Sequence, residues 1–296
     1  MPRIGFVGLG HMGLPMAINL LKAGHQVSGF DLQQSAMDKL TEAGGIALSN
    51  VQDAAINQDI FITMLQTGKQ VSQVCLGKQG LYEAASKALH IDCSTIDVES
   101  SRELHRQASE HHLLKVDAPV SGGVAGASAG TLTFMVGGDE QAFQQAKPIL
   151  SAMGKNIFHT GLAGSGQAAK ICNNMILGIS MIAISEAFVL AEQLGLSAQK
   201  LAEVVNNSSG QCWAMSKYVP VPNVLPDVPA NRNYQPGFTV AMMLKDLKLS
   251  QAAAHETNTK TLLGEKAAAI YQRFGEAGFG ELDFSAIIKS LKQETM

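Results

Sequence analysis

The sequence predicts an α/β domain with a doubly wound, mostly parallel sheet, followed by an all-α domain. Short β-branched runs alternate with helix-length amphipathic segments up to about residue 160. After about residue 163 the pattern becomes helical, and it starts with one long apolar segment. The length of 296 residues fits two domains of about 150 residues each. We place the domains at 1–162 and 163–296, with the long helix joining them.

The expected elements follow from these patterns in chain order. The strands are predicted at Ile4–Val7, Gln26–Phe30, Ile60–Met64, Leu89–Asp92, Leu114–Asp117, Thr131–Val136 and Ile157–Phe158. Helical periodicity marks Met12–Lys22, Ala36–Ala43, Ser165–Gly195, Ser197–Val205, Thr239–Glu256, Leu262–Phe274 and Phe284–Leu291. Four prolines precede Pro236-Gly237 in 220–237, so that stretch is predicted to be an ordered loop.

Composition excludes several classes of protein. Hydrophobic residues make up 46% of the chain, which excludes a disordered protein. The net charge of −3 gives no basic surface, so we expect no nucleic-acid partner. Four scattered cysteines have no zinc or redox spacing, and no metal site is expected.

The most hydrophobic stretch, 175–191, contains Gly178, Ser180, Ser185 and Glu186. A membrane span needs about 20 predominantly apolar residues. We therefore expect no membrane insertion, and a helix covered by protein on all sides. The first residues lead directly into a strand pattern without a targeting segment, which predicts a cytoplasmic location.

A glycine motif follows the first expected strand. Gly8, Gly10 and Gly13 form G-x-G-x-x-G, with His11 and Met12 inside it. The glycines permit a tight turn, a close approach of backbone to a pyrophosphate, and close packing of helix on strand. Asp31 follows the second strand, 18 residues after Gly13. At that position a carboxylate accepts hydrogen bonds from the ribose hydroxyls and repels a 2′-phosphate. The pattern predicts a Rossmann-type site for NAD rather than NADP. An ordinary glycine turn and a solvated carboxylate are the alternatives.

Two further loops should reach the same ligand, because ligands of such sheets bind beyond the carboxyl ends of the strands. Met64 and Leu65 lie at the end of one strand, and Thr95 follows another. We expect these three residues to contact the cofactor. Without the glycine motif they would be unremarkable loop residues.

A serine and two glycines follow the strand that ends at Asp117. Ser121, Gly122 and Gly123 can present consecutive N–H groups that bind a carboxylate. The alternative is a flexible connector.

Two polar residues interrupt the long apolar helix. Lys170 and Asn174 are four residues apart and therefore project from one face, within about 40° of each other. Polar side chains in apolar surroundings cost solvation free energy unless they are paired or used. Burial lowers the pKa of a lysine towards the range useful for proton transfer. We therefore favour an acid/base role for Lys170 over a surface lysine.

The chain resembles the β-hydroxyacid dehydrogenase family over nearly its whole length. The resemblance rests on four separated motifs, at 5–17, 117–123, 166–174 and 245–246. It implies that Lys170 is the catalytic acid/base and that Asn174 binds substrate together with Ser121, Gly122 and Gly123. It also implies that Lys245 and Asp246 lie near cofactor and substrate, although composition alone suggests a charged helix face. Helices of the second domain are expected to pack in a homodimer or homotetramer.

The segment 207–214 resembles the branch of the family that acts on 3-hydroxyisobutyrate. This implies NAD-dependent oxidation of that 3-hydroxyacid to methylmalonate semialdehyde, in valine catabolism. Trp213 and Phe238 are expected to form an apolar wall for the 2-methyl group, with core packing of Trp213 as an equal alternative.

Substrate choice stays open, because a methyl group in an apolar pocket contributes only about 1–3 kcal/mol. Tartronate semialdehyde, 3-hydroxypropionate and serine are therefore alternative substrates. A non-catalytic NAD-binding sensor on the same fold is the alternative from another class.

Overall fold

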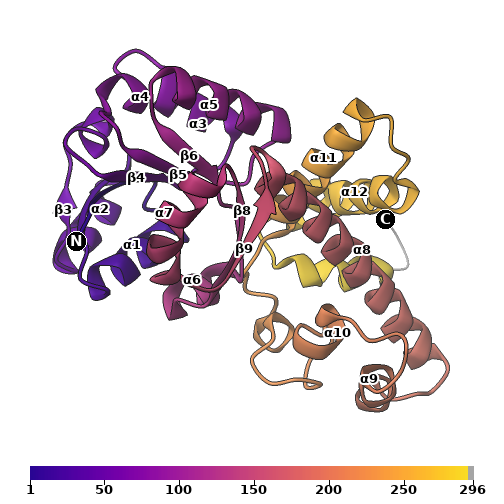
Figure 1. Cartoon of the computed structure of the whole chain (residues 1–296). Helices are drawn as coiled ribbons and strands as arrows, with labels where there is room; N and C mark the ends of the chain where they lie inside the picture. Colours follow the sequence, from indigo (N-terminus) through magenta and orange to yellow (C-terminus); the bar gives the residue numbers. More distant parts are fainter. Residues whose placement is uncertain (293–296) are drawn as a thin grey trace. The chain divides into compact units, whose positions relative to one another are not determined.

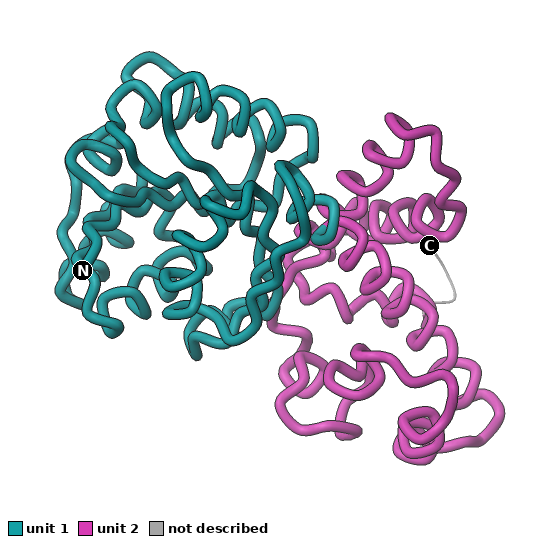
Figure 2. The backbone as a smooth tube through the Cα atoms, in the orientation of Figure 1, with its two compact units in different colours: residues 1–170 teal, residues 171–296 magenta. Residues whose placement is uncertain are grey.

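The computed structural model describes residues 1–292 and divides into two compact units (Figure 2). Unit 1 covers Met1–Lys170, and unit 2 begins at Ile171. This division falls inside the long helix α8 (Ser165–Gln193). It lies later than the domain boundary expected between 162 and 163, because the start of α8 is hydrogen-bonded to unit 1 through Asp117.

Unit 1 contains the predicted mostly parallel sheet, in the order β3-β2-β1-β4-β5-β6-β8-β7, with β9 paired to β8 (Figure 1). The strands from β3 to β6 are parallel, and β8 runs antiparallel to β6 and β7. The bounds are β1 (Arg3–Val7), β2 (Gln26–Phe30), β3 (Ile46–Ala47), β4 (Ile60–Thr63), β5 (Leu89–Asp92), β6 (Leu114–Asp117), β7 (Val120–Ser121), β8 (Leu132–Gly137) and β9 (Gly154–Gly161).

Helices cover both faces of this sheet, as is usual for parallel strands joined by helical crossovers. The side chains of each strand alternate between the two covered faces. Ile4 and Phe6 of β1 belong to one apolar cluster, which also contains Met16 and Leu20 of α1. Val7 belongs to the cluster on the other face. The helices of unit 1 are α1 (Gly13–Lys22), α2 (Gln34–Glu42), α3 (Gly68–Leu76), α4 (Leu81–Ala84), α5 (Val98–Glu110), α6 (Gly123–Ala129) and α7 (Glu140–Ser151), with a 3₁₀ turn at Val51–Ala54.

Unit 2 is helical, as predicted. Its elements after α8 are α9 (Ala198–Asn206), α10 (Trp213–Lys217), α11 (Val240–Glu256), α12 (Leu262–Phe274) and α13 (Lys289–Lys292). Short 3₁₀ turns lie at Pro229–Arg232 and Phe284–Ile288, and a π turn at Gly275–Phe279. Gly195 ends α8 with φ +77°, the left-handed conformation that glycine adopts most easily.

The long helix α8 is less covered than the sequence suggests. It is long and hydrophobic enough to meet the length and composition of a membrane span, yet 44% of its most hydrophobic 18-residue window is buried. Ile176 is 63% exposed and Leu190 is 60% exposed. Within the single chain the helix is therefore covered on only part of its circumference. The expected cover on all sides includes neighbouring subunits and stays a prediction.

Candidate active site

The parallel strands of unit 1 end in one row. The register pairs Val7 with Phe30 on one side and with Thr63 on the other. Thr63 is paired with Asp92, and Asp92 with Asp117. The loops that follow these five positions therefore open at the same edge of the sheet, where ligands of open α/β sheets bind.

The glycine loop has the geometry that a pyrophosphate requires. Gly8 has φ +96°, and a Cβ there would lie 2.3 Å from the carbonyl oxygen of Met64. A Cβ on Gly13 would lie 1.9 Å from the carbonyl oxygen of Gly8, so the start of α1 packs directly on the turn. A Cβ on Gly10 would meet no atom of the described residues within 4 Å, which leaves open space over that backbone. His11 is exposed and Met12 is partly buried in the same loop. The loop and the amino end of α1 together fit the phosphates of a dinucleotide.

Asp31 also holds the glycine loop in place. Its Oδ2 accepts a hydrogen bond from the Leu9 amide at 2.7 Å, and its Oδ1 accepts one from the Gln33 amide at 2.8 Å. These bonds fix the carboxylate, and each carboxylate oxygen can accept a second hydrogen bond. Asp31 is therefore placed to accept from ribose hydroxyls.

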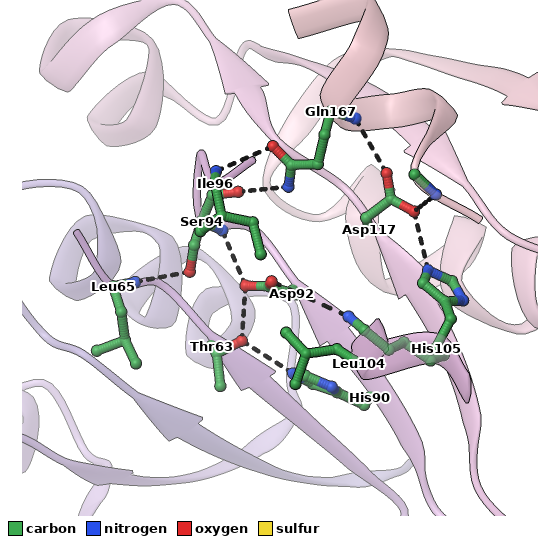
Figure 3. Close-up of polar contacts among 12 residues, drawn as sticks. Thr63, Leu65, His90, Asp92, Ser94, Ile96, Leu104, His105, Asp117 and Gln167 are labelled. Carbon is green, nitrogen blue, oxygen red and sulfur yellow. Dashed lines mark hydrogen bonds and ion pairs between the residues drawn. The ribbon is translucent and has the colours of Figure 1, made fainter. Parts of the chain in front are cut away.

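The two neighbouring loops are tied together by a serine (Figure 3). The Ser94 hydroxyl accepts a hydrogen bond from the Leu65 amide at 2.9 Å, and the Ser94 amide donates to Asp92 Oδ1 at 3.1 Å. Met64, Leu65 and Thr95 are all partly exposed at this edge of the sheet. The three residues predicted to contact the cofactor thus belong to cross-linked loops.

A buried polar network lies beneath these loops. The Thr63 hydroxyl donates to Asp92 Oδ1 at 2.8 Å, and His90 Nε2 lies 2.9 Å from the same hydroxyl. The Tyr82 hydroxyl lies 2.8 Å from His90 Nδ1, and Lys115 Nζ lies 4.0 Å from Asp92 Oδ2. Burial lowers the pKa of His90 well below its usual value, so the ring is neutral. This network supports the strand ends from within.

The Ser121–Gly123 loop lies at the same end of the unit. Gly122 has φ +134° and Gly123 has φ +61°, conformations that side chains disfavour. A Cβ on Gly122 would lie 3.1 Å from Leu132 Cδ2. The glycines are therefore required by the turn itself, and the flexible connector considered from the sequence does not describe it.

Lys170 lies on α8, within unit 1, and is 6% exposed. The alternative of a surface lysine is therefore wrong. The turn that precedes it is anchored to two strand ends, because Asp117 accepts from the amides of Gly164 and Gln167 and the Gln167 side chain bonds the loop after β5 (Figure 3). The start of α8 thus lies at the same edge as the glycine loop.

Asn174, Lys245 and Asp246 form a cluster within unit 2. The Asn174 side-chain amide donates to Asp246 Oδ2, and Asn173 Nδ2 donates to Asn174 Oδ1 at 2.9 Å. Lys245 Nζ lies 3.5 Å from Asp246 Oδ1. Asp246 is only 2% exposed, so the interpretation of Lys245-Asp246 as a charged helix face is wrong. The carboxylate fixes the orientation of Asn174 on α8.

Trp213 and Phe238 belong to one chain of aromatic rings in unit 2. Trp213 stacks on Tyr218 with ring centroids 5.2 Å apart, Tyr218 stacks on Phe284 at 5.3 Å, and Phe238 meets Phe284 edge-on at 5.8 Å. Trp213 is 54% exposed, which disfavours simple core packing. Burial, with the Asp283 carboxylate beside the ring, raises the pKa of Tyr218 above its usual value, so its hydroxyl remains a donor.

Sequence reasoning missed the residues that hold these groups. Asp117 and Gln167 stood inside recognised motifs without a role, and Asp283 and Tyr218 were not singled out. A carboxylate as the last residue of a predicted strand was the available signal for Asp117. Nothing local marked Asp283, whose partner Tyr218 lies 65 residues away in the chain.

Known proteins match this chain along its length. Residues 3–161 match the family model described as the NAD-binding domain of 6-phosphogluconate dehydrogenase. Residues 164–291 match the model described as "NAD-binding of NADP-dependent 3-hydroxyisobutyrate dehydrogenase".

Three similar proteins illustrate the relationship. A "probable 3-hydroxyisobutyrate dehydrogenase" of Mycobacterium tuberculosis is 48% identical over 99% of this chain and 98% of its own. An "NAD-dependent L-serine dehydrogenase" of Pseudomonas aeruginosa is 47% identical over 98% and 97%. A solved structure of M. tuberculosis 3-hydroxyisobutyrate dehydrogenase with L-serine has a TM-score of 0.94 and 47% identity, over 99% of this chain and 100% of that one.

These matches cover both units. Both family models are described as NAD-binding, the second one for an NADP-dependent enzyme, and a relative named as NAD-dependent agrees with the cofactor predicted from the glycine loop and Asp31. They also set aside the non-catalytic sensor considered from the sequence, because the relatives are named as dehydrogenases. The chain belongs to the 3-hydroxyisobutyrate dehydrogenase family and is an NAD-dependent oxidoreductase.

Proposed function

We propose that this enzyme oxidises 3-hydroxyisobutyrate to methylmalonate semialdehyde, a step of valine catabolism, with Lys170 as acid/base. One observation carries the proposal. Lys170 is buried on a helix whose first turn is hydrogen-bonded to the loop after β5, at the edge where the glycine loop lies. A lysine at this edge of the sheet is proposed to meet the nicotinamide end of a bound dinucleotide, since ligands of such sheets bind beyond the carboxyl ends of the strands.

Each residue then has a defined task in the reaction. The Ser121–Gly123 turn binds the substrate carboxylate through its N–H groups. The family resemblance implies that Asn174, whose side chain is held by Asp246, also binds the substrate. Lys170 in its neutral form accepts the hydroxyl proton at Nζ, and returns it in the reverse direction. Bound NAD supplies the acceptor for the hydride that leaves the carbinol carbon.

L-serine is the second candidate substrate. It is also a 3-hydroxyacid, with an amino group where 3-hydroxyisobutyrate has its methyl group. One relative at 47% identity is named as an L-serine dehydrogenase, and the solved relative is named with L-serine. We propose that the exposed Trp213 ring contacts the methyl group of 3-hydroxyisobutyrate, because burial of a methyl group against a ring is favourable, whereas an ammonium group beside the ring edge loses hydration.

Comparison of kcat/KM tests the substrate. We expect 3-hydroxyisobutyrate to exceed L-serine, 3-hydroxypropionate and tartronate semialdehyde (the last assayed as reduction by NADH). The expected advantage over L-serine is about 10-fold or more, the value of one methyl-sized contact. A higher kcat/KM for one of the other substrates would place the enzyme in a different substrate branch of the family.

Replacement of the lysine tests the mechanism. We expect Lys170→Ala to lower kcat by about 10²–10⁴-fold, because the general base is lost. NAD affinity should change little. Lys147→Ala, at an exposed lysine of α7, serves as the matched control. Turnover near that of the control would show that Lys170 is not the base.

The exposed apolar residues of α8 suggest an interface with other copies of the chain. We propose a homodimer or homotetramer in which the exposed part of α8, including Ile176 and Leu190, packs on another copy. Light scattering of the purified protein would measure its mass, and a monomer would contradict this proposal. The cytoplasmic location and the absence of nucleic-acid or membrane partners stay predictions.

A further inference from the structure

Asp117 connects three elements of unit 1 at one point. It ends β6 and is fully buried. Its Oδ1 accepts hydrogen bonds from the Gly164 amide at 2.8 Å and from His105 Nε2 at 2.9 Å, and its Oδ2 accepts from the Gln167 amide at 3.0 Å. The first amides of a helix have no partner within the helix, and its amino end favours negative charge. Asp117 thus caps α8 from a distant strand.

Gln167 ties the same turn of α8 to the cofactor side. Its side chain is fully buried, donates to the Ser94 carbonyl at 2.8 Å and accepts from the Ile96 amide at 3.1 Å. Both ends of a planar amide are used, which fixes its orientation. The loop between these two contacts contains Thr95, which the sequence assigns to the cofactor.

The contact between helix start and sheet leaves no spare room. A Cβ on Gly166 would lie 2.3 Å from the Met135 carbonyl oxygen and 2.6 Å from the Asp117 carbonyl oxygen. The first turn of α8 therefore lies directly on the strand ends, and its position is set by backbone contact as well as by hydrogen bonds.

We infer that Asp117 and Gln167 are positioning residues, which fix Lys170 at its working distance from the substrate and couple that position to the cofactor loop after β5. Lys170 follows Gln167 by three residues, which places both on the same side of α8. A displacement of the helix start moves the lysine with it. An error of about 1 Å in such a position can cost about 10²-fold in rate. This inference rests on the proposed role of Lys170.

The test compares Asp117→Asn with wild type. An asparagine has the same shape, but its NH₂ group must face at least one of the three donors, so one contact of the helix start is lost. We expect kcat to fall by about 10–100-fold, while KM and the Kd of NAD change by less than about threefold. Gln167→Leu removes both contacts to the loop after β5 and should likewise lower kcat more than it raises KM. It provides the second measurement if Asp117→Asn does not fold.

Asp139→Asn is the matched control. Asp139 accepts from the Ala142 amide at 2.7 Å and caps α7, a helix of unit 1 that carries no predicted site residue. It should keep kcat within about twofold of wild type. A kcat loss shared by this control, or a loss matched by equal increases in KM and in the Kd of NAD, would overturn the inference.

Hydrogen exchange separates this inference from the proposed function. We expect the amides of 164–170 to exchange faster in Asp117→Asn than in wild type or in Asp139→Asn, whether or not the enzyme turns over a 3-hydroxyacid. If the wild-type protein oxidises none of the tested substrates, the proposed function fails. The exchange rates would still show whether Asp117 holds the start of α8. Unchanged exchange and unchanged kcat in Asp117→Asn would refute the positioning role.

Discussion

Each unit buries an aspartate that accepts from several donors, but the two aspartates anchor different parts of the molecule. In unit 1, Asp117 binds backbone amides at the start of the helix that carries Lys170. In unit 2, Asp283 binds the amides of Gly237 and Phe238 at 3.0 and 3.3 Å, and the Tyr218 hydroxyl at 3.0 Å. Unit 1 thus fixes the loops predicted to bind the cofactor and the lysine proposed as proton acceptor, whereas unit 2 fixes an aromatic surface.

The difference indicates a division of work between the two units. Buried titratable groups lie close together in unit 1, in the network of His90, Asp92 and Lys115 beneath the cofactor loops. The aromatic rings of unit 2 offer shape and apolar contact. We therefore expect changes in unit 1 to alter cofactor binding and kcat, and changes around the aromatic rings of unit 2 to alter KM and substrate preference.

Among the variants that test this comparison, Asp283→Asn is expected to have the largest effect. The carboxylate also accepts from the Ser285 amide at 3.0 Å and the Ser285 hydroxyl at 2.7 Å, so donors surround both of its oxygens. An asparagine places its NH₂ group against donors in either orientation. We expect the free energy of unfolding to fall by about 3 kcal/mol. Thermal denaturation compared with Asp227→Asn, at an exposed aspartate of the same unit, measures this.

The same variant tests the division of work. At a temperature where it is folded, we expect Asp283→Asn to raise KM for the hydroxyacid more than it lowers kcat. Its Kd for NAD should stay close to that of wild type. A loss of NAD affinity in this variant would instead show that cofactor binding is not confined to unit 1.

Asp31→Ser is expected to have the next largest effect, and on the cofactor alone. The substitution removes the carboxylate that accepts from the Leu9 amide and that is predicted to bind the ribose. We expect the Kd of NAD to rise by about 10–100-fold and the preference over NADP to shrink, since a serine does not repel a 2′-phosphate. Titration with both dinucleotides checks this.

Asp38→Ser, at an exposed aspartate of α2, is its control. An unchanged ratio of NAD to NADP affinity in Asp31→Ser would show that the carboxylate does not select the cofactor.

Structural features whose signal lies within a few neighbouring residues are predictable from the sequence, whereas features that depend on residues far apart in the chain are not. The strands from β1 to β6 were predicted within a residue or two, except β3, because each is a short segment with at least one β-branched residue, separated from the next by turn residues or a helical pattern. β3 and β7 were not predicted, since two residues carry no periodic pattern. β9 is longer than predicted, because its polar residues hide the strand pattern.

The same rule governs the site. The glycine loop and Lys170 were predictable because their signals lie within a few neighbouring residues. The roles of Asp117 and Gln167 depend on partners 47 to 73 residues away. Hydrogen bonds of that separation leave no local trace in one sequence, so the residues that position the chemistry were found only in the structure.

Trp213→Leu should produce a smaller change, confined to substrate preference. The substitution removes the ring that stacks on Tyr218 and leaves a side chain of smaller area. We expect kcat/KM to fall by about 10-fold more for 3-hydroxyisobutyrate than for L-serine, because the lost contact is the one proposed for the methyl group. Steady-state kinetics with both substrates measures the ratio. Equal losses for both would remove Trp213 from the proposed apolar wall.

The smallest effect concerns pH and stability, and it should originate in unit 1. Folded His90 is kept neutral by burial, with Lys115 and His105 also disfavouring its protonation. An unfolded histidine binds a proton below about pH 6.5. The unfolded state thus gains protons first as the pH falls, and the free energy of unfolding decreases by up to about 1.4 kcal/mol per pH unit for this residue.

Urea unfolding at about pH 7.5 and about pH 5.5 checks this expectation. His90→Gln should be less stable than wild type at the higher pH, because the contacts with Thr63 and Tyr82 are altered. It should lose less stability on acidification, since one titrating group is gone. His255→Gln, at an exposed histidine of unit 2, should keep the wild-type pH dependence. If both variants show the same slope as wild type, the acid sensitivity does not come from the network beneath the cofactor loops.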